Sequence, residues 1–291
     1  MPLEQIDAFF TGPALLCALV GLGLVVGVLT GLFGVGGGFL LNPLLIVLFG
    51  MDESLVVGSS LSFTIGTGAS GAARHMRSRN VEFRSVLILG FGAVIGAVLG
   101  SWLHEFLRGL LKHDFKRLLL ALYLALLVLT GLLVLRGSGG TKTRRSLLQR
   151  LPLPPRVDLP HAGLVRVSLP GMVLVGLVIG VANGLLGIGG GVLFMPVLLL
   201  VVGLSAHQAV GTSLGVVLFS SIAGTIEHSQ AGNVSLWIAM SLLAGSTVGV
   251  QIGAWLCERS HAAKLRRYFA VIVLLAAVLV AADLARKLIG R

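Results

Sequence analysis

A glycine-broken apolar segment occurs twice in this chain of 291 residues. The stretch Gly31-Leu-Phe-Gly-Val-Gly-Gly-Gly-Phe-Leu-Leu41 returns 153 positions later as Gly184-Leu-Leu-Gly-Ile-Gly-Gly-Gly-Val-Leu-Phe194. Each glycine destabilises a helix by about 1 kcal/mol relative to alanine, and a broken helix exposes backbone groups that lipid cannot hydrogen-bond. Such a break is tolerated only inside protein or against a water-filled cavity. Paired broken segments in two halves are typical of a transporter's binding site.

The composition predicts a multi-pass membrane protein. Hydrophobic residues make up 56% of the chain and charged residues 11%, whereas soluble domains carry about 25% charged residues. No Asp, Glu, Lys or Arg occurs from Ala8 to Met51 or from Val167 to Ile226, while one span needs roughly 20 apolar residues. Because no Lys or Arg precedes the first apolar segment, we expect that segment to be retained rather than cleaved as a signal peptide.

Several other classes of protein are excluded or disfavoured. The net charge of +11 does not predict nucleic-acid binding, because the basic residues lie between the apolar segments. Cys17 and Cys257 form no spacing pattern, so neither a disulfide, a metal site nor a cofactor is expected. No strand precedes the glycine runs, which argues against a nucleotide-binding fold. The chain also lacks an ATP-binding motif and the His-Glu-x-x-His and Gly-x-Gly-Asp motifs of intramembrane enzymes, so we predict no enzymatic activity.

Ten apolar segments form two sets of five. They cover approximately 10–33, 39–50, 55–73, 85–103 and 118–135, then 169–187, 192–203, 208–226, 236–256 and 268–285. A shift of 153 aligns residues 31–103 with 184–256 without a gap, and 24 of these 73 pairs are identical. The sequence therefore predicts an all-α polytopic membrane protein with two homologous halves, residues 1–135 and 169–291, joined by a linker over 136–168.

The linker and the loops predict the topology. Residues 136–166 hold seven Lys or Arg and four prolines, so we expect a solvated linker on the cytoplasmic side. The two 12-residue segments would form only about 18 Å of helix, too short for a core of about 30 Å. If they re-enter or are enclosed by protein, each half has an odd number of crossings and the repeat is inverted. In agreement, Arg74–Arg84 carries four Lys or Arg, whereas the matched Glu227–Trp237 carries none.

The glycine runs predict an anion site. Each run is followed by a proline, Pro43 or Pro196, which favours a helix that restarts after the break. A helix N-terminus offers free N–H donors and about half a positive charge. We therefore predict that a small anion binds the backbone of two triplets: Gly36, Gly37 and Gly38, and Gly189, Gly190 and Gly191. The alternative is that these glycines only allow helices to pack closely.

Polar side chains near the breaks are further candidates. In the hydroxyl-rich third segment of each half, two matched pairs follow Gly58 or Gly211 directly. These pairs, together with an amide in the restarted segment, are the predicted substrate-binding side chains: Ser59 with Thr212, Ser60 with Ser213, and Asn42. Alternatively, hydroxyls in membranes bond to their own or neighbouring helices. Packing is the role expected of the Gly-x-x-x-Gly series Gly92, Gly96, Gly100 and Gly245, Gly249, Gly253.

Two matched histidines close the third segments. His75 corresponds to His228, which Glu227 precedes. Because the pKa of histidine lies near physiological pH, these three residues are candidates for coupling transport to protons. The alternative role for the histidines is to anchor the helices at the membrane interface.

The residues quoted above resemble a known family. The doubled Gly-x-Gly-Gly-Gly with proline a few residues later, Gly-Ser-Ser-Leu at 58–61 and Gly-Thr-Ser-Leu at 211–214 are similar to the TauE/SafE sulfite exporters, also called toluene sulfonate uptake permeases. The resemblance covers roughly 14–135 and 170–287. It implies a secondary transporter of the inner (plasma) membrane for a small sulfur-containing anion such as sulfite, a sulfonate or sulfoacetate. A coupling proton or sodium ion and the lipid bilayer are the other expected partners, and an anion channel or facilitator is the alternative function.

Overall fold

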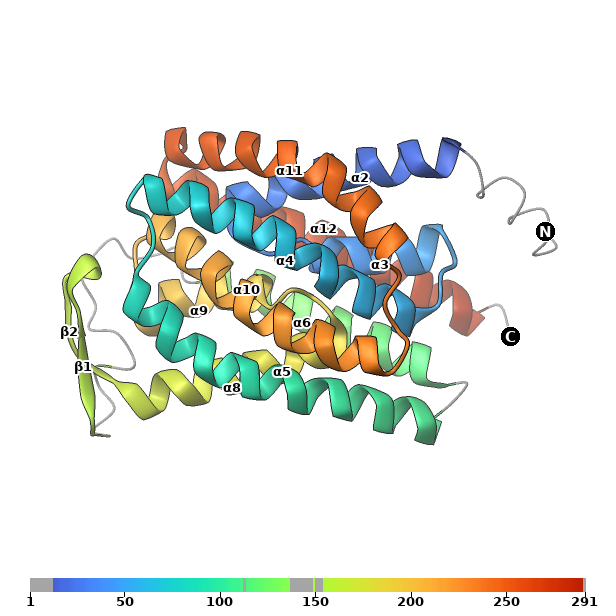
Figure 1. Ribbon diagram of the computed structural model, residues 1–291, viewed down its shortest axis with the longest axis horizontal. Coiled ribbons are helices and arrows are strands. Elements are labelled where there is room, and N and C mark those ends of the chain that lie inside the picture. Colours follow the sequence, from blue (N-terminus) through green and yellow to red (C-terminus); the bar gives the residue numbers. More distant parts are fainter. Residues whose placement is uncertain (1–12, 112–113, 137–148, 150–153, 290–291) are drawn as a thin grey trace.

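The computed structural model describes residues 13–111, 114–136, 149 and 154–289, and these form a bundle of helices with one small hairpin (Figure 1). The first half contains α2 (Pro13–Phe33), α3 (Gly38–Leu48), α4 (Glu53–Arg77), α5 (Phe83–Leu111) and α6 (Phe115–Arg136). The second contains α8 (Leu169–Leu186), α9 (Gly191–Val197), the π-helical turn η4 (Leu198–Val202), α10 (Ala206–Gln230), α11 (Leu236–Arg259) and α12 (Ala262–Ile289).

The all-α prediction is confirmed. Within the described residues, all ten predicted apolar segments lie mainly on helices, and the short segments correspond to α3 and to α9 with η4. Seven helices are long and apolar enough to cross a membrane by length and composition. Of the long helices, only α4 is not among them, although it is the matched partner of α10, because its hydroxyls and charged last turn lower its hydropathy. The molecule is therefore a multi-pass helical membrane protein.

Side chains at matched positions set where the two central helices begin. The carboxylate of Asp52 accepts hydrogen bonds from the backbone N–H groups of Ser54 and Leu55, which caps α4. At the matched position, Ser205 forms a capping box with Gln208 at the start of α10. Such caps satisfy N–H groups that the first helical turn leaves free and contribute about 1 kcal/mol each. Capping residues at matched positions therefore set the start of α4 and of α10 at the same point of each half.

A β-hairpin precedes α8, in the region predicted to be a solvated linker. Strand β1 (Arg156–Leu159) pairs antiparallel with β2 (Leu164–Ser168), with the 3-10 turn η3 (Pro160–Ala162) between them. Leu159 and Val167 are fully buried, and Figure 1 places the hairpin at one end of the bundle. The prolines and basic residues of this region did not predict strands. Residues 137–148 and 150–153 of the predicted linker lie outside the described residues.

The matched central helices α4 and α10 run in opposite directions through the middle of the bundle (Figure 1). Gly58, near the start of α4, lies against His228 near the end of α10. Gly211, near the start of α10, lies against His75 near the end of α4. The prediction of an inverted repeat requires such an antiparallel arrangement, although the orientation of each end across the membrane remains a prediction.

Each of four outer helices packs against an outer helix of the other half. Helix α2 packs in parallel along α11, and α5 packs in parallel along α8. Glycines line both contacts. A Cβ atom built on Gly27 would lie 2.6 Å from the carbonyl oxygen of Ser246, and one built on Gly96 would lie 2.2 Å from that of Leu177. The close-packing role predicted for the Gly-x-x-x-Gly series is confirmed, since all six of its glycines meet backbone of the opposite half.

The Gly27→Ala variant tests this glycine contact. The added methyl group would push α2 away from α11, and such overpacking costs about 1–3 kcal/mol, so the melting temperature in detergent is expected to fall by several degrees. Gly21→Ala is the control, because a Cβ atom on Gly21 of the same helix meets nothing within 4 Å. Equal melting temperatures for the two variants would contradict a packing role for Gly27.

Candidate functional site at the glycine breaks

Both glycine runs interrupt their helices as predicted. Helix α2 ends at Phe33 and α3 begins at Gly38, while α8 ends at Leu186 and α9 begins at Gly191. Three glycines in each run have positive φ angles that other residues adopt only with strain: Gly34, Gly36 and Gly37 at 73°, 75° and 87°, and Gly187, Gly189 and Gly190 at 63°, 72° and 67°. Glycine is therefore required for the backbone path as well as for packing.

The two breaks meet each other at the centre of the molecule. A Cβ atom on Gly38 would lie 2.3 Å from the carbonyl oxygen of Gly187, and one on Gly191 would lie 2.5 Å from that of Gly34. Gly36 and Gly189 face each other in the same way, at 3.1 Å from a Cβ atom on Gly36 to the Gly189 oxygen. The whole meeting point, residues 33–39 and 186–192, is buried. The backbones of the two breaks are thus in direct contact, which only glycine allows because every other residue carries a Cβ atom.

Backbone donors in the breaks lack partners. In the described part of the chain, no acceptor receives a hydrogen bond from the N–H groups of three residues in each break: Val35, Gly36 and Gly37, and Ile188, Gly189 and Gly190. Most buried N–H groups are paired in native proteins. Six unpaired donors in two touching segments therefore form a site that an anion could satisfy.

Hydroxyls of the central helices brace the breaks of the opposite half. Ser60 Oγ lies 3.0 Å from the carbonyl oxygen of Gly187, and Ser213 Oγ lies 2.7 Å from that of Gly34. Thr64 Oγ1 donates to the Gly36 oxygen at 2.9 Å; sequence reasoning missed this residue, whose matched position is a valine. The structure thus brings Ser60 and Ser213 to the breaks, where their protons point at carbonyl groups.

The other predicted pair, Ser59 and Thr212, lies away from the breaks. Ser59 Oγ accepts a hydrogen bond from the N–H group of Ser235, just before α11. Thr212 Oγ1 accepts one from the N–H group of Glu82, just before α5. Both distances are 2.9 Å. These hydroxyls anchor turns, and their role as substrate ligands stays a prediction.

Asn42 connects α3 to the second break. Its Nδ2 group donates to the carbonyl oxygens of Leu186 and Gly187 at 2.9 and 3.0 Å, and it also contacts the Tyr123 hydroxyl. Tyr123 itself donates to the Leu186 oxygen. Within the described residues the Oδ1 atom of Asn42 has no partner. Because this free atom is an acceptor, the present geometry favours a positioning role, and anion binding by Asn42 stays a prediction.

The matched histidines hold the last turns before the breaks. His75 Nε2 lies 3.0 Å from the carbonyl oxygen of Gly31, and His228 Nε2 lies 2.9 Å from that of Gly184. Both rings are buried. Glu227 is directed elsewhere, since its carboxylate accepts a hydrogen bond from Trp102 Nε1 at 2.8 Å. The histidines therefore contact the broken helices directly, while proton coupling by the three residues stays a prediction.

Sequence reasoning missed two residues beside His228. His104 and Glu105 of α5 lie next to it, and the two imidazole rings are 4.9 Å apart. The signal was present, because Trp102-Leu-His-Glu105 matches Trp255-Leu-Cys-Glu258 at the same shift of 153. The paired glutamates lie just beyond the stretch that was aligned without a gap.

Comparisons with known proteins agree with this architecture. No solved structure matches the chain. “Probable membrane transporter protein YjnA” of Bacillus subtilis is 31% identical over 257 residues, which cover 88% of this chain and 96% of that protein. A “Probable membrane transporter protein” of Xylella fastidiosa is 30% identical over 272 residues, covering 91% and 94%, and one of Haemophilus influenzae is 29% identical over 285 residues, covering 91% and 96%.

A family model gives the same result over a longer stretch than either half alone. The model described as Sulfite exporter TauE/SafE matches residues 19–280. This match spans both glycine breaks and the region between the halves. The chain belongs to the TauE/SafE sulfite exporter family of membrane transporters.

Proposed function

We propose that the protein is a secondary transporter that moves a small sulfur-containing anion, such as sulfite, a sulfonate or sulfoacetate, across the plasma membrane. The observation that carries this proposal is the set of six unpaired backbone N–H groups in the two touching breaks. An oxyanion bound there accepts hydrogen bonds from donors that have no partner in the described chain. Helix N-termini at Gly38 and Gly191 add favourable dipoles.

The charges around the breaks support binding by the backbone. Helices α2, α3, α8 and α9 contain no Lys or Arg. A full charge at the centre of a bilayer costs about 2.5–3.5 kcal/mol on insertion scales. Partial charges on N–H groups avoid that cost and still attract an anion. Ser60 and Ser213 join the backbone as ligands when their hydroxyls rotate away from the carbonyl groups.

The burial of the breaks supports a carrier over a channel. Because residues 33–39 and 186–192 are buried, an anion reaches them only after helices move. A carrier requires such movement, while an open pore does not. The alternative, an anion channel or facilitator, predicts flux that does not saturate at low millimolar substrate.

We further propose that the two halves have opposite orientations in the membrane, with the linker 136–168 in the cytoplasm. The antiparallel pair α4 and α10 supports this topology. A proton or sodium ion drives transport, and His75 and His228 are the proton-carrying candidates because their Nδ1 atoms have no partner among the described residues.

A thermal-shift screen of the purified protein tests the proposed substrate class. Sulfite, sulfate, thiosulfate, sulfonates and carboxylates are compared, since a ligand that binds the native state raises its melting temperature. We expect one or more of the sulfur-containing anions to stabilise the protein and the carboxylates to have no effect. Stabilisation by carboxylates alone would exclude a sulfur-containing substrate.

Cysteine labelling tests the orientation of the halves. Arg77 and Gln230 are exposed, matched residues at the ends of α4 and α10. In a Cys17→Ser background, Arg77→Cys and Gln230→Cys are expected to react with an impermeant maleimide from opposite faces of the membrane. Positions 79 and 232 are avoided because their φ angles are 55° and 73°. Labelling from one face would exclude the inverted topology.

Loss of either bracing hydroxyl is expected to weaken anion binding. The Ser60→Ala and Ser213→Ala variants each remove a hydroxyl that donates to a carbonyl group of the opposite break, and a hydrogen bond of this kind contributes about 1 kcal/mol. We expect the dissociation constant to rise about five- to tenfold. Thr67→Val is the control, since the Thr67 hydroxyl bonds only within its own helix. Equal effects of all three variants would place the anion elsewhere.

Substitution of a break glycine is expected to abolish binding. Gly37 and Gly190 have φ angles of 87° and 67°, which valine adopts only with strain, so Gly37→Val and Gly190→Val distort the backbone donors. Both variants are measured by anion-induced thermal shift, with membrane insertion checked by size-exclusion chromatography. The control, Arg77→Gln, alters an exposed cation and is expected to bind normally. Normal binding by the two glycine variants, together with loss of binding in Arg77→Gln, would place the anion at the membrane surface.

A further inference from the structure

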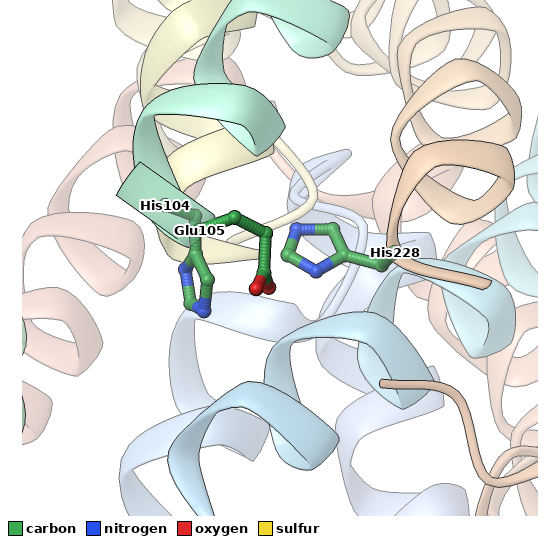
Figure 2. Close-up of side chains that lie close together, drawn as sticks. All are labelled: His104, Glu105 and His228. Carbon is green, nitrogen blue, oxygen red and sulfur yellow. The ribbon is translucent and has the colours of Figure 1, made fainter. Parts of the chain in front are cut away.

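We propose that His104, Glu105 and His228 form a binding site for a first-row transition-metal cation such as Zn²⁺. Each residue offers one ligand atom, and these atoms all lie within 4.8 Å of one another. Figure 2 shows the Glu105 carboxylate pointing between the two imidazole rings. The proposal is independent of the anion that the protein carries.

Two backbone carbonyl groups fix the protonation of the imidazoles. His104 Nδ1 lies 2.7 Å from the oxygen of Leu185, and His228 Nε2 lies 2.9 Å from the oxygen of Gly184. Because a carbonyl oxygen only accepts, each of these nitrogens carries the hydrogen. The other nitrogens, His104 Nε2 and His228 Nδ1, therefore present lone pairs. A metal-binding histidine almost always donates its second N–H group in this way.

Both lone pairs are available to a cation. His228 is only 1% exposed, and its Nδ1 atom has no hydrogen-bond partner among the described residues. His104 Nε2 lies 2.9 Å from the Ser54 hydroxyl, which a bound cation would replace as its partner. Two ligands of a tetrahedral Zn²⁺ ion lie about 3.3 Å apart, given ligand distances of about 2.0–2.1 Å. Small side-chain rotations would bring the three ligand atoms to this spacing.

The carboxylate of Glu105 is also available. It is half-buried and forms no ion pair among the described residues. Asn233 links it to Arg108, because Asn233 Nδ2 donates to Glu105 while its Oδ1 accepts from Arg108 at 3.0 Å. The charge of Glu105 can therefore compensate a divalent cation.

The opposite end of the molecule provides an internal comparison. The matched residues are Cys257, Glu258 and His75, which are also types that bind metals. His75 likewise has an unpartnered Nδ1 atom, so this feature alone does not mark a metal site. Glu258, however, bonds to Ser78 and pairs with Arg74 at 3.3 Å. Among the described residues, the end with His104 is the one where a carboxylate without an ion pair lies beside two imidazole rings.

The ligand set also selects the class of metal. Two imidazole nitrogens and one carboxylate suit Zn²⁺ and neighbouring transition metals, whereas Mg²⁺ and Ca²⁺ prefer oxygen ligands. A bound metal would occupy the His228 Nδ1 atom, so metal binding and proton binding at this atom would exclude each other, whereas His75 is unaffected. Because both histidines hold the last turn of α8, an occupied site would also fix that turn just before the second glycine break.

Zn²⁺ binding to the purified, untagged protein tests the site. Competition with a chromophoric chelator is expected to give one Zn²⁺ per chain, with no binding of Mg²⁺. Glu105→Gln is expected to weaken Zn²⁺ binding at least tenfold, because the amide still accepts from Asn233 but lacks the charge. Glu258→Gln, the matched control at the other end, is expected to bind as the unmodified protein does.

His104→Gln is the second variant and is also expected to bind Zn²⁺ at least tenfold more weakly. Its amide nitrogen can still donate to Leu185, and melting temperatures without metal confirm folding of each variant. Absence of Zn²⁺ binding by the unmodified protein would overturn the proposal. Binding that survives both Glu105→Gln and His104→Gln, or that is lost in Glu258→Gln, would overturn it as well.

Discussion

Contact between the backbones of the two glycine breaks is the constraint on which the centre of this protein depends. A side chain at Gly38 or Gly191 would collide with the carbonyl groups of the other break, so the two segments touch only because both lack Cβ atoms. This contact leaves the N–H groups of the breaks unpaired and aims their carbonyl groups at Ser60, Ser213 and Thr64. The same contact therefore provides both the unpaired N–H donors for an anion and the carbonyl groups to which the three hydroxyls bond.

The two halves share the same order of helices and glycine breaks, but not all of their side chains are matched. Caps, break glycines, serines and histidines are matched between the halves. Asn42, by contrast, corresponds to Met195 and Thr64 to Val217, so polar contacts at the centre are more numerous on one side. In the part of the chain that the structure describes, the group of one carboxylate and two histidines likewise occurs at one end. A duplicated scaffold thus carries two chemically different ends.

The sequence predicted the helices and the breaks because both depend on local composition. Apolar length gave the ten segments, and glycine clusters located the breaks. Helical phase explains why Ser60 reached the break and Ser59 did not, since consecutive residues point about 100° apart around a helix. Tyr123 was missed because only tertiary packing brings it to Asn42. His104 was missed although the repeat continues through it, because its contact with His228 follows from tertiary packing. The β-hairpin was missed because its apolar residues, such as Leu159 and Val167, lie in a region rich in prolines and basic residues.

The exchange of outer helices has a consequence for how the protein is made. Helix α2 is the first of the described helices along the chain, yet α11, the helix that packs on its glycines, follows nearly all the others. Until α11 is made, the glycine-lined face of α2 lies against lipid or another helix. Contacts so distant in sequence form slowly, and neither half can complete its packing alone. The two halves are therefore one folding unit, and separate expression of either is expected to yield an incomplete bundle.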